Sequence, residues 1–415
     1  MKALIHVNVI LPNETGDFCI KNDYAILYEE TIHRILPMSL WDGTAKEVLD
    51  VKGQYVSPGF INIHVHGCGG MDTMDEDPEA LPVMARIQAS MGVTSFLPTT
   101  MSYDIPRIHR AFHRIRECME HPVPGGARIL GCHMEGPYIS PDHRGAQAET
   151  YIRRANAADL KGFERVVKLI TLAPETLPDW SFAEYCQQRG ILLSIGHTSA
   201  SYEQAMEAVE HHGIRHFTHL FNAMTGFHHR NPGAVGAALD TGANCELIAD
   251  NIHSHPAAQR LAWHAKGGRN IILITDSMRA CGMGDGPSEL GGQKVFVHGE
   301  LATLEDGTIA GSVLKMNRAI SIFRKNTGAP LPQVIETVTK TPAEELGIYG
   351  EIGSIEEGKQ ADFAIFDEGL DISASIISGK VAYQYRLYPT TELFDSSIDR
   401  RLIFANDFMQ QRRLV

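Results

Sequence analysis

The sequence predicts an α/β protein: a (β/α)8 barrel of the TIM type with a small β-sandwich domain built from both termini. Two observations predict this fold. Eight short apolar runs alternate with helical patterns through the middle of the 415-residue chain, which is typical of a parallel sheet buried on both faces. Both ends of the chain instead show alternating strand patterns interrupted by turns. Eight strand–helix repeats favour a closed barrel over a doubly wound sheet.

The two ends of the chain are expected to meet in one small domain. Residues 2–11 and 23–36 are predicted to be strands, separated by a turn-rich segment, and residues 353–367 again alternate between strand and turn. We therefore expect residues 1–55 and 355–415 to form the small β domain and residues 56–354 to form the barrel. The alternative is two unrelated β segments.

The barrel strands are expected in the eight apolar runs, each of which ends in polar residues. These runs are Phe60–His66, Thr94–Thr100, Arg128–Glu135, Val167–Glu175, Leu192–His197, His216–Asn222, Glu246–His253 and Asn270–Asp276. Two helices have clear start signals: Asp104 suits an N-cap, and Ser201 with Gln204 forms a capping box. Because barrel active sites lie at the C-terminal ends of the strands, the polar residues there are the candidate site.

Composition limits the class of partner. The net charge of -13 argues against a nucleic-acid surface, which needs a basic stripe. No apolar stretch approaches the roughly 20 residues that cross a membrane, and the apolar start of the chain alternates like a strand rather than a signal peptide. The seven cysteines are widely spaced and form no CxxC pair, so we expect a reducing, cytoplasmic location without disulfides or a thiolate zinc site.

Five candidate metal ligands come from four different strand ends. His64 and His66 point the same way because side chains alternate along a strand, while Glu135, His197 and His219 end other strands. Imidazoles and a carboxylate suit zinc or another first-row divalent ion. A single strand histidine is more often a hydrogen-bonded core residue. The agreement of four strand ends within one barrel favours a metal site.

Asp276 ends the eighth apolar run and is the candidate catalytic residue. An aspartate after an apolar run can simply cap the following turn. In a metal-containing barrel it would lie near the attacking water, where it could accept a proton and later return it to a departing amine.

Several segments resemble the amidohydrolase superfamily, and more narrowly the N-acetylglucosamine-6-phosphate deacetylase family. They are residues 58–67 (PGFINIHVHG), 133–138 (HMEGPY), 196–198 (GHT), 218–224 (THLFNAM), 248–253 (IADNIH), 273–276 (LITD) and 310–312 (AGS). The resemblance covers roughly residues 1 to 385 in the same order. The HMEGPY and THLFNAM segments are specific, whereas the HxH pair alone is weak evidence.

The resemblance implies a metal assignment. Glu135, His197 and His219 would hold the main divalent ion, and His64 and His66 would add a second position bridged by Glu135. Other branches of the family replace the HxH pair and use one metal, so one or two ions per subunit are expected. Zinc is the first choice, and iron, manganese or cobalt also suit these ligands.

The resemblance also implies substrate contacts and an assembly. Asn222 and the backbone of Ala223 would contact the sugar phosphate, Arg230 would grip the phosphate with its guanidinium fork, and His253 would lie on the substrate side. Without the motif, Arg230 reads as a solvated loop residue and His253 as a loop stabiliser. A homodimer is expected, in which Arg230 serves its own or a neighbouring subunit's site.

Other positions distinguish this chain from related proteins. Gln147 stands where the family often carries a substrate-facing histidine; it is expected to contact the substrate, and His143 or Arg144 could substitute for it. Lys168 lies at the beginning of its strand, so a carbamylated-lysine bridge, and with it a dihydroorotase-like or hydantoinase-like reading, is not expected. The tail 386–415 has no counterpart in the family and could pack on the barrel or at a subunit contact.

The expected reaction is the hydrolytic deacetylation of an N-acetyl amino sugar 6-phosphate, foremost N-acetyl-D-glucosamine 6-phosphate. The alternatives are another N-acetyl hexosamine phosphate such as N-acetylgalactosamine 6-phosphate, or a different amidohydrolase or deaminase acting on an uncharged substrate. A non-enzymatic scaffold is disfavoured because all five ligands and Asp276 are present.

Overall fold

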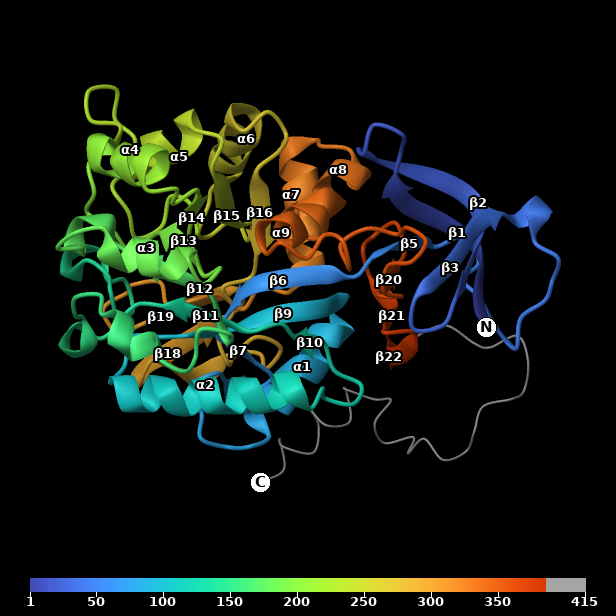
Figure 1. The fold of residues 1–415 in the computed structure, drawn as a ribbon, viewed down its shortest axis with the longest axis horizontal. Coiled ribbons are helices and arrows are strands. Elements are labelled where there is room, and N and C mark those ends of the chain that lie inside the picture. The colour runs from blue at the N-terminus through green and yellow to red at the C-terminus, as the bar shows by residue number, and fades with distance from the viewer. Residues whose placement is uncertain (386–415) are drawn as a thin grey trace.

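A barrel of parallel strands forms the centre of the protein, as the computed structural model shows for residues 1–385 (Figure 1). Its strands are β6 (Phe60–Val65), β9 (Val93–Thr100), β11 (Cys132–Glu135), β12 (Val167–Leu172), β13 (Leu192–Ile195), β14 (His216–Phe217), β15 (Asn244–Ile248) and β16 (Ile271–Ile274). Each pairs in parallel with the next, from β6 to β16. A bridge from Val65 to Ser277, just after β16, brings the last strand back to the first. The predicted α/β barrel is therefore confirmed.

Each of the eight predicted runs overlaps one of these strands, although β9 and β15 begin one and two residues before their predicted runs. The third run is divided into two strands. β10 (Arg128–Ile129) pairs with the middle of β9, and β11 pairs with the C-terminal end of β9. The strands are almost wholly buried, as expected for a sheet covered on both faces.

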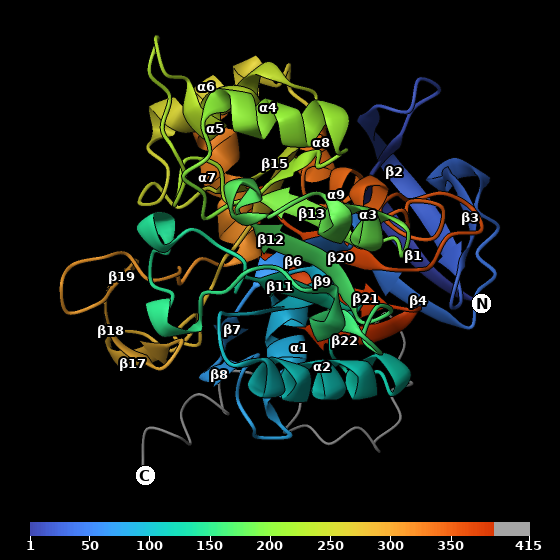
Figure 2. The same cartoon turned by 60° about the vertical axis from the view of Figure 1, so that its left-hand side comes forward.

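Helices cover the outside of the barrel (Figure 2). They are α1 (Ala80–Ser90), α2 (Ile105–Glu120), α3 (Ser181–Gln187), α4 (Tyr202–His211), α5 (Gly233–Asp240), α6 (Pro256–Ala265), α7 (Met316–Thr327), α8 (Leu331–Glu336) and α9 (Lys340–Glu345). Both predicted starts are present: Asp104 accepts from the Arg107 amide, and Ser201 and Gln204 form the complete capping box. Within residues 1–385, no helix combines the length and the apolar character needed to span a bilayer.

Short elements fill the loops. They are the 3-10 turns η1 (Met38–Leu40), η2 (Pro141–His143), η3 (Glu149–Tyr151), η4 (Ala157–Leu160) and η5 (Pro174–Thr176), the hairpin β7 (Gly67–Cys68) and β8 (Met71–Asp72), and the sheet β17 (Gly286–Leu290), β18 (Gln293–His298) and β19 (Leu301–Thr303). The side chain of Gln293 in this three-stranded sheet donates to the Ala146 carbonyl. The sheet therefore touches the loop that carries Gln147.

The small domain draws its strands from both termini, as predicted. They are β1 (Lys2–Pro12), β2 (Phe18–Tyr28), β3 (Ile32–Pro37), β4 (Glu47–Asp50), β5 (Tyr55–Pro58), β20 (Phe363–Phe366), β21 (Ile372–Ile377) and β22 (Lys380–Gln384). They form one continuous mixed sheet in which the first half of β1 pairs with β4 and the second half with β5. Leu4, Val9, Phe363 and Ala374 share one buried core, so strands from both ends enclose it.

The ends of the chain differ in part from the prediction. The single strand predicted over residues 23–36 is wrong: β2 and β3 are separate strands, because the exposed pair Glu29 and Glu30 makes a turn between them. The predicted domain limits stay a prediction; β5 belongs to the small sheet and runs directly into β6. The predicted role of the tail concerns residues 386–415, which lie outside the described residues.

Candidate metal centre and active site

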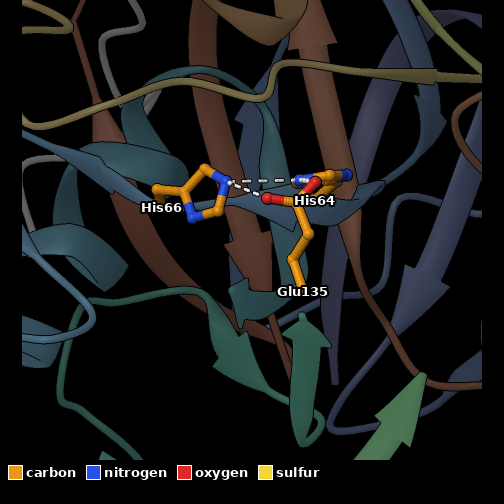
Figure 3. A group of neighbouring side chains, drawn as sticks. All are labelled: His64, His66 and Glu135. Atoms are coloured by element: carbon orange, nitrogen blue, oxygen red, sulfur yellow. Dashed lines mark hydrogen bonds and ion pairs between the residues drawn. The ribbon is translucent and has the colours of Figure 1, made fainter. Parts of the chain in front are cut away.

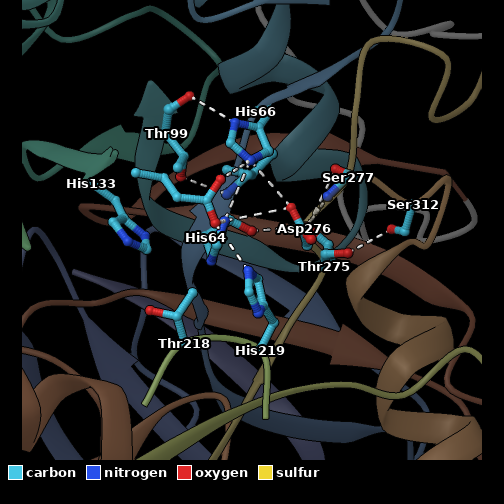
Figure 4. A network of polar contacts seen from close by, with 12 residues as sticks. His64, His66, Thr99, His133, Thr218, His219, Thr275, Asp276, Ser277 and Ser312 are labelled. Carbon is cyan, nitrogen blue, oxygen red and sulfur yellow. Dashed lines mark hydrogen bonds and ion pairs between the residues drawn. The ribbon is translucent and has the colours of Figure 1, made fainter. Parts of the chain in front are cut away.

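The five predicted ligands lie together at the C-terminal ends of their strands, and all five are buried. Figure 4 shows the rings of His64, His66 and His219 beside Asp276. His64 lies within β6 and Glu135 ends β11. His66 follows β6 by one residue, and His197 and His219 each follow their strand by two. The C-terminal ends of parallel strands all lie at one end of the barrel. His64 and His219, which are 155 positions apart in the sequence, therefore meet there.

Glu135, His197 and His219 form the first group. The Glu135 Oε1 atom lies 3.2 Å from His197 Nε2 and 3.1 Å from His219 Nε2, and the two nitrogens are 3.1 Å apart. Ligands held about 2.0–2.2 Å from a zinc-sized ion lie roughly 3 Å from one another, so this triangle has the right size. Two imidazole nitrogens and a carboxylate oxygen are also the donors that such an ion prefers. The residues therefore fit a divalent cation.

His64, His66 and Glu135 form the second group (Figure 3). The two Nε2 atoms are 3.4 Å apart, and Glu135 places Oε1 3.4 Å from His64 and Oε2 3.3 Å from His66. Glu135 thus presents one oxygen to both groups and the other to the second alone. Burial disfavours its charge, but the imidazoles of His197 and His64 hold the pKa of Glu135 well below its usual range. It is an ionised carboxylate at the centre of four histidines.

The opposite ring nitrogens hold the histidines in place. His66 Nδ1 lies 3.2 Å from the Thr99 carbonyl, and His197 Nδ1 lies 2.8 Å from the His143 carbonyl. A ring that donates from Nδ1 to a carbonyl presents the lone pair of Nε2, which is the form that binds a metal. Among the described residues, the buried Nδ1 of His219 has no hydrogen-bond partner.

Several site residues occupy an uncommon backbone conformation. His197, His219, Ala223 and Asp276 have φ values of 47°, 29°, 49° and 46°. Residues with a Cβ rarely adopt this left-handed region, and such strain concentrates at functional sites. All four residues follow the ends of barrel strands, where the backbone leaves the strand conformation.

Asp276 lies beside the second group. Its Oδ1 atom is 3.4 Å from His64 Nε2 and 3.3 Å from His66 Nε2. Its amide donates to the His64 carbonyl over 3.0 Å, and its carbonyl accepts from the Ser312 amide over 2.9 Å. Although burial opposes ionisation, the neighbouring His64 and His66 lower the pKa of Asp276. It is therefore an anchored, ionised carboxylate that can accept a proton.

Gln147 is buried and contacts the central carboxylate. Its Nε2 donates to Glu135 Oε2 over 2.8 Å, while its Oε1 accepts from the Ser102 amide over 2.9 Å and from the Ser102 hydroxyl. The side-chain amide of Gln147 therefore orients the carboxylate of Glu135. Substrate contact by Gln147 stays a prediction.

The other predicted substrate residues lie in the segments that follow β14 and β15. Asn222 donates to the His219 carbonyl over 3.2 Å, and the Ala223 carbonyl accepts from the Thr198 amide over 3.0 Å. Both hydrogen bonds stabilise the loop after β14. Arg230 is exposed in the segment before α5, and its guanidinium lies 2.8 Å from the neighbouring ring of His229. His253, which follows β15, places Nδ1 2.6 Å from Asp250. Within residues 1–385, the polar side-chain contacts of Arg230 and His253 are thus local rather than with the metal ligands.

Two polar residues of the site were missed in the sequence. His133 packs edge-on to His64 at 4.4 Å between ring centroids, and Glu246 Oε2 lies 2.8 Å from His64 Nδ1. Burial, helped by the nearby His64, lowers the pKa of His133 to about 3, so it is a neutral ring. Glu246 could have been found in the sequence, because it is a carboxylate in the middle of an apolar strand. An unpaired charge is strongly disfavoured in a buried strand, so such a residue is expected to have a buried partner.

Two buried histidine–carboxylate groups at the C-terminal mouth of a (β/α)8 barrel, with an ionised aspartate beside them, define a metal-dependent hydrolase that uses water. A family model agrees with this class. The model described as "Amidohydrolase family" matches residues 55–389. The chain belongs to this family.

Individual relatives are more specific. The chain is 38% identical over 384 residues to N-acetylglucosamine-6-phosphate deacetylase of Bacillus subtilis (strain 168), which covers 91% of this chain and 96% of that protein. It is 36% identical over 340 residues to N-acetylgalactosamine-6-phosphate deacetylase of Escherichia coli O157:H7, covering 81% and 89%. The crystal structure of N-acetylglucosamine-6-phosphate deacetylase from Pasteurella multocida superposes with a TM-score of 0.85 at 27% identity, covering 92% and 99%. The resemblance found in the sequence is confirmed.

Proposed function

We propose that the protein hydrolyses the acetamide of N-acetyl-D-glucosamine 6-phosphate to glucosamine 6-phosphate and acetate. The observation that carries the proposal is the convergence of Asp276 and two Glu135-centred ligand groups, in a chain 38% identical to a deacetylase of this substrate. An amide carbonyl needs an activated water and a proton for its departing nitrogen, and this site contains groups for both.

The metal assignment is part of the proposal. Glu135, His197 and His219 would hold the main ion, and His64 and His66 would share Glu135 with a second. When bound, a divalent ion acts as a Lewis acid that polarises the carbonyl and makes water acidic enough to act near neutral pH. Zinc suits these imidazole and carboxylate donors, as do iron, manganese and cobalt.

Asp276 supplies the proton transfers. Its carboxylate accepts a proton from the attacking water while the water oxygen forms a bond to the acetyl carbon. The resulting carboxylic acid then donates this proton to the amino-sugar nitrogen as the carbon–nitrogen bond breaks. Acetic acid and the free amine result, and Asp276 is again ionised. The proton on the acetic acid hydroxyl then passes to the released amine or to solvent, which gives acetate. One residue can serve in both steps because it lies beside the ligand groups, within 3.4 Å of His64 and His66.

Substrate recognition is assigned to the rim of the barrel. Arg230 would bind the 6-phosphate through parallel hydrogen bonds, which its planar guanidinium supports better than a lysine. Asn222 and the backbone of Ala223 would support the same end of the sugar, and His253 and Gln147 would face its ring. The exposure of Arg230 supports this role, because its guanidinium is accessible to a ligand.

We also propose a cytoplasmic homodimer. All seven cysteines are free thiols, which suits a reducing compartment. Phe227, with 62% of its surface exposed, adjoins Arg230, and an exposed aromatic side chain there suits a subunit contact. Sedimentation of the purified protein tests the assembly.

An acetate-release assay tests the reaction. The 6-phosphates of N-acetylglucosamine and N-acetylgalactosamine are compared with their unphosphorylated forms, with and without chelator. We expect the glucosamine phosphate to be preferred and the chelator to abolish turnover. Preference for the galactosamine phosphate would reassign the sugar, and equal turnover of the unphosphorylated sugars would contradict the proposal.

Arg230→Ala tests the phosphate contact. Because it removes charge-assisted hydrogen bonds worth about 1.5–3 kcal/mol each, KM for the phosphorylated sugar should rise by about 10–100-fold. KM for the unphosphorylated sugar should not change. Arg260→Ala, on the exposed face of α6, is the matched control.

A further inference from the structure

A line of buried histidines and carboxylates runs from the second ligand group toward the opposite end of the barrel. His64 Nδ1 lies 2.8 Å from Glu246 Oε2, Glu246 Oε1 lies 3.2 Å from His216 Nε2, and His216 Nδ1 lies 3.0 Å from Glu345 Oε1. His64, Glu246 and His216 are each fully buried. The line ends at the amide of Asn244, which donates to Glu345. It connects β6, β15, β14 and α9.

Glu246 also contacts the other ligand group. Its Oε2 accepts from the His219 backbone amide over 3.2 Å, in addition to the ring of His64. Its own carbonyl accepts from the Leu220 amide over 2.8 Å. A single residue on β15 therefore fixes a ligand of each group, one through its ring and one through its backbone.

The charges along the line explain how a carboxylate is tolerated inside the barrel. An isolated buried carboxylate is strongly disfavoured, but His216 lies between Glu246 and Glu345 as a cation. Although burial alone would lower it, the two carboxylates raise the pKa of His216 to about 10. The Glu246 Oε2 atom that faces the ring of His64 also accepts from the His219 backbone amide, so Glu246 acts as a hydrogen-bond acceptor on this side.

We propose that Glu246 is a positioning residue for the metal centre. It holds His64 in the tautomer that carries its proton on Nδ1, so that the Nε2 lone pair faces the second metal position, and it fixes the backbone of His219 at the main position. The inference rests on the metal site of the proposed function. Ligand histidines commonly use such a carboxylate partner, and its loss typically weakens metal binding by about 10–100-fold.

Direct coordination by Glu246 is the alternative, because His64, His133 and Glu246 also lie close enough to form a three-residue group. The contacts of His133 oppose it. Its Nδ1 lies 3.0 Å from the Ile63 carbonyl and its Nε2 lies 2.7 Å from the Thr171 hydroxyl, so both ring nitrogens are engaged within the protein. The 2.8 Å between His64 Nδ1 and Glu246 is a hydrogen-bond length.

The experiment compares Glu246→Gln with Glu345→Gln. Both remove one buried carboxylate that contacts His216, but only Glu246 contacts His64. Metal content and affinity are measured by titrating zinc into the chelator-treated proteins. We expect E246Q to weaken the second ion by about 10–100-fold and E345Q to leave it unchanged. Equal affinities in E246Q and wild type, or equal losses in both variants, overturn the inference.

A double variant tests whether the effect passes through His64. If Glu246 acts on the second ion through this ring, E246Q should cause no further loss of that ion in a His64→Asn protein. An additional loss at the second position would mean that Glu246 acts on it by another route, which overturns the inference.

The wild type provides a measurement that needs no stable variant at Glu246. In the zinc-loaded protein with 15N-labelled histidine, the His64 signals are assigned by their absence in H64N. We expect a protonated Nδ1 and a metal-coordinated Nε2; coordination through Nδ1 overturns the inference. A wild type that binds no divalent ion contradicts the proposed function itself, whereas normal zinc binding with the other tautomer contradicts only the role of Glu246.

Discussion

The two histidine pairs of the site are brought together by different features of the backbone. His64 and His66 are two residues apart on and just after β6, so ordinary strand alternation points both rings inward. His197 and His219 follow the ends of β13 and β14 and adopt left-handed φ values of 47° and 29°. Regular structure suffices for the first pair, whereas the second depends on a strained backbone that the surrounding barrel must stabilise.

The support of the two pairs also differs. His64 is held by the carboxylate of Glu246 at 2.8 Å, whereas within the described residues His219 has no hydrogen-bond partner at Nδ1. Asp276 contacts only the first pair among the four rings. We infer that the ring of His64 depends on buried charge, whereas His197 and His219 depend on backbone geometry. Substitutions at and around the two pairs test this contrast.

Asp276→Asn should have the largest effect. It removes the proton acceptor beside the His64–His66 pair, so kcat should fall by about 10²–10⁴-fold. Metal content, measured by elemental analysis, should remain that of the wild type because no proposed ligand changes. Asp306→Asn, on an exposed turn, is the matched control. Turnover near the wild-type rate in D276N would contradict the assignment of Asp276.

Ligand substitutions in the two pairs should separate the two metal positions. His197→Asn removes a ligand of the main position. It should weaken metal binding by more than the roughly 10–100-fold that follows the loss of a residue that only hydrogen-bonds to a ligand. His66→Asn should release one ion and leave the main one bound. The stoichiometry after dialysis distinguishes the two variants. Identical loss from both would mean that the site behaves as one cluster rather than two positions.

The buried charges of Glu246 and His216, next to His64, should make the free energy of unfolding depend on pH. His216 has a folded pKa raised to about 10 by Glu246 and Glu345, against burial, from an ordinary value of 6.5. The stability it contributes is therefore complete below about pH 6.5 and is lost as the pH rises through about 10. The destabilisation caused by His216→Gln, from urea unfolding of chelator-treated protein, should shrink between pH 7 and 10.

The exposed strand residue His298 provides the control for this experiment. His298→Gln should cause no loss of stability that changes over the same pH interval. A constant difference between wild type and H216Q across this interval would show that the buried line carries no net charge at His216.

Relief of backbone strain near His219 should have the smallest effect on the free energy of unfolding. Ala223, with a φ of 49°, lies in the same left-handed segment as His219. Ala223→Gly relieves strain worth roughly 1–2 kcal/mol but adds freedom to the unfolded chain, so we expect a gain of up to about 1 kcal/mol in the free energy of unfolding. Ala258→Gly, within α6, should instead cost about 0.5–1 kcal/mol. Losses of equal size in both variants would contradict the argument from strain.

The architecture and the set of candidate ligands could be predicted from the sequence alone. Eight apolar runs predict the barrel because burial on both faces leaves a local record in every strand. The caps at Asp104 and Ser201 are equally local, since each involves residues at most three positions apart. His64, His66, Glu135, His197 and His219 could be named because parallel strands share one end, and the resemblance added their roles.

The contacts that support these residues could be seen only in the folded chain. Glu246 lies 182 positions from His64 and 99 from Glu345, so neither local spacing nor periodicity could join them. The contact of Gln147 with Glu135 depends on how the loop after β11 folds back, which no strand pattern specifies. Hydrogen bonds between distant side chains follow from packing, and packing is a property of the assembled barrel rather than of any segment.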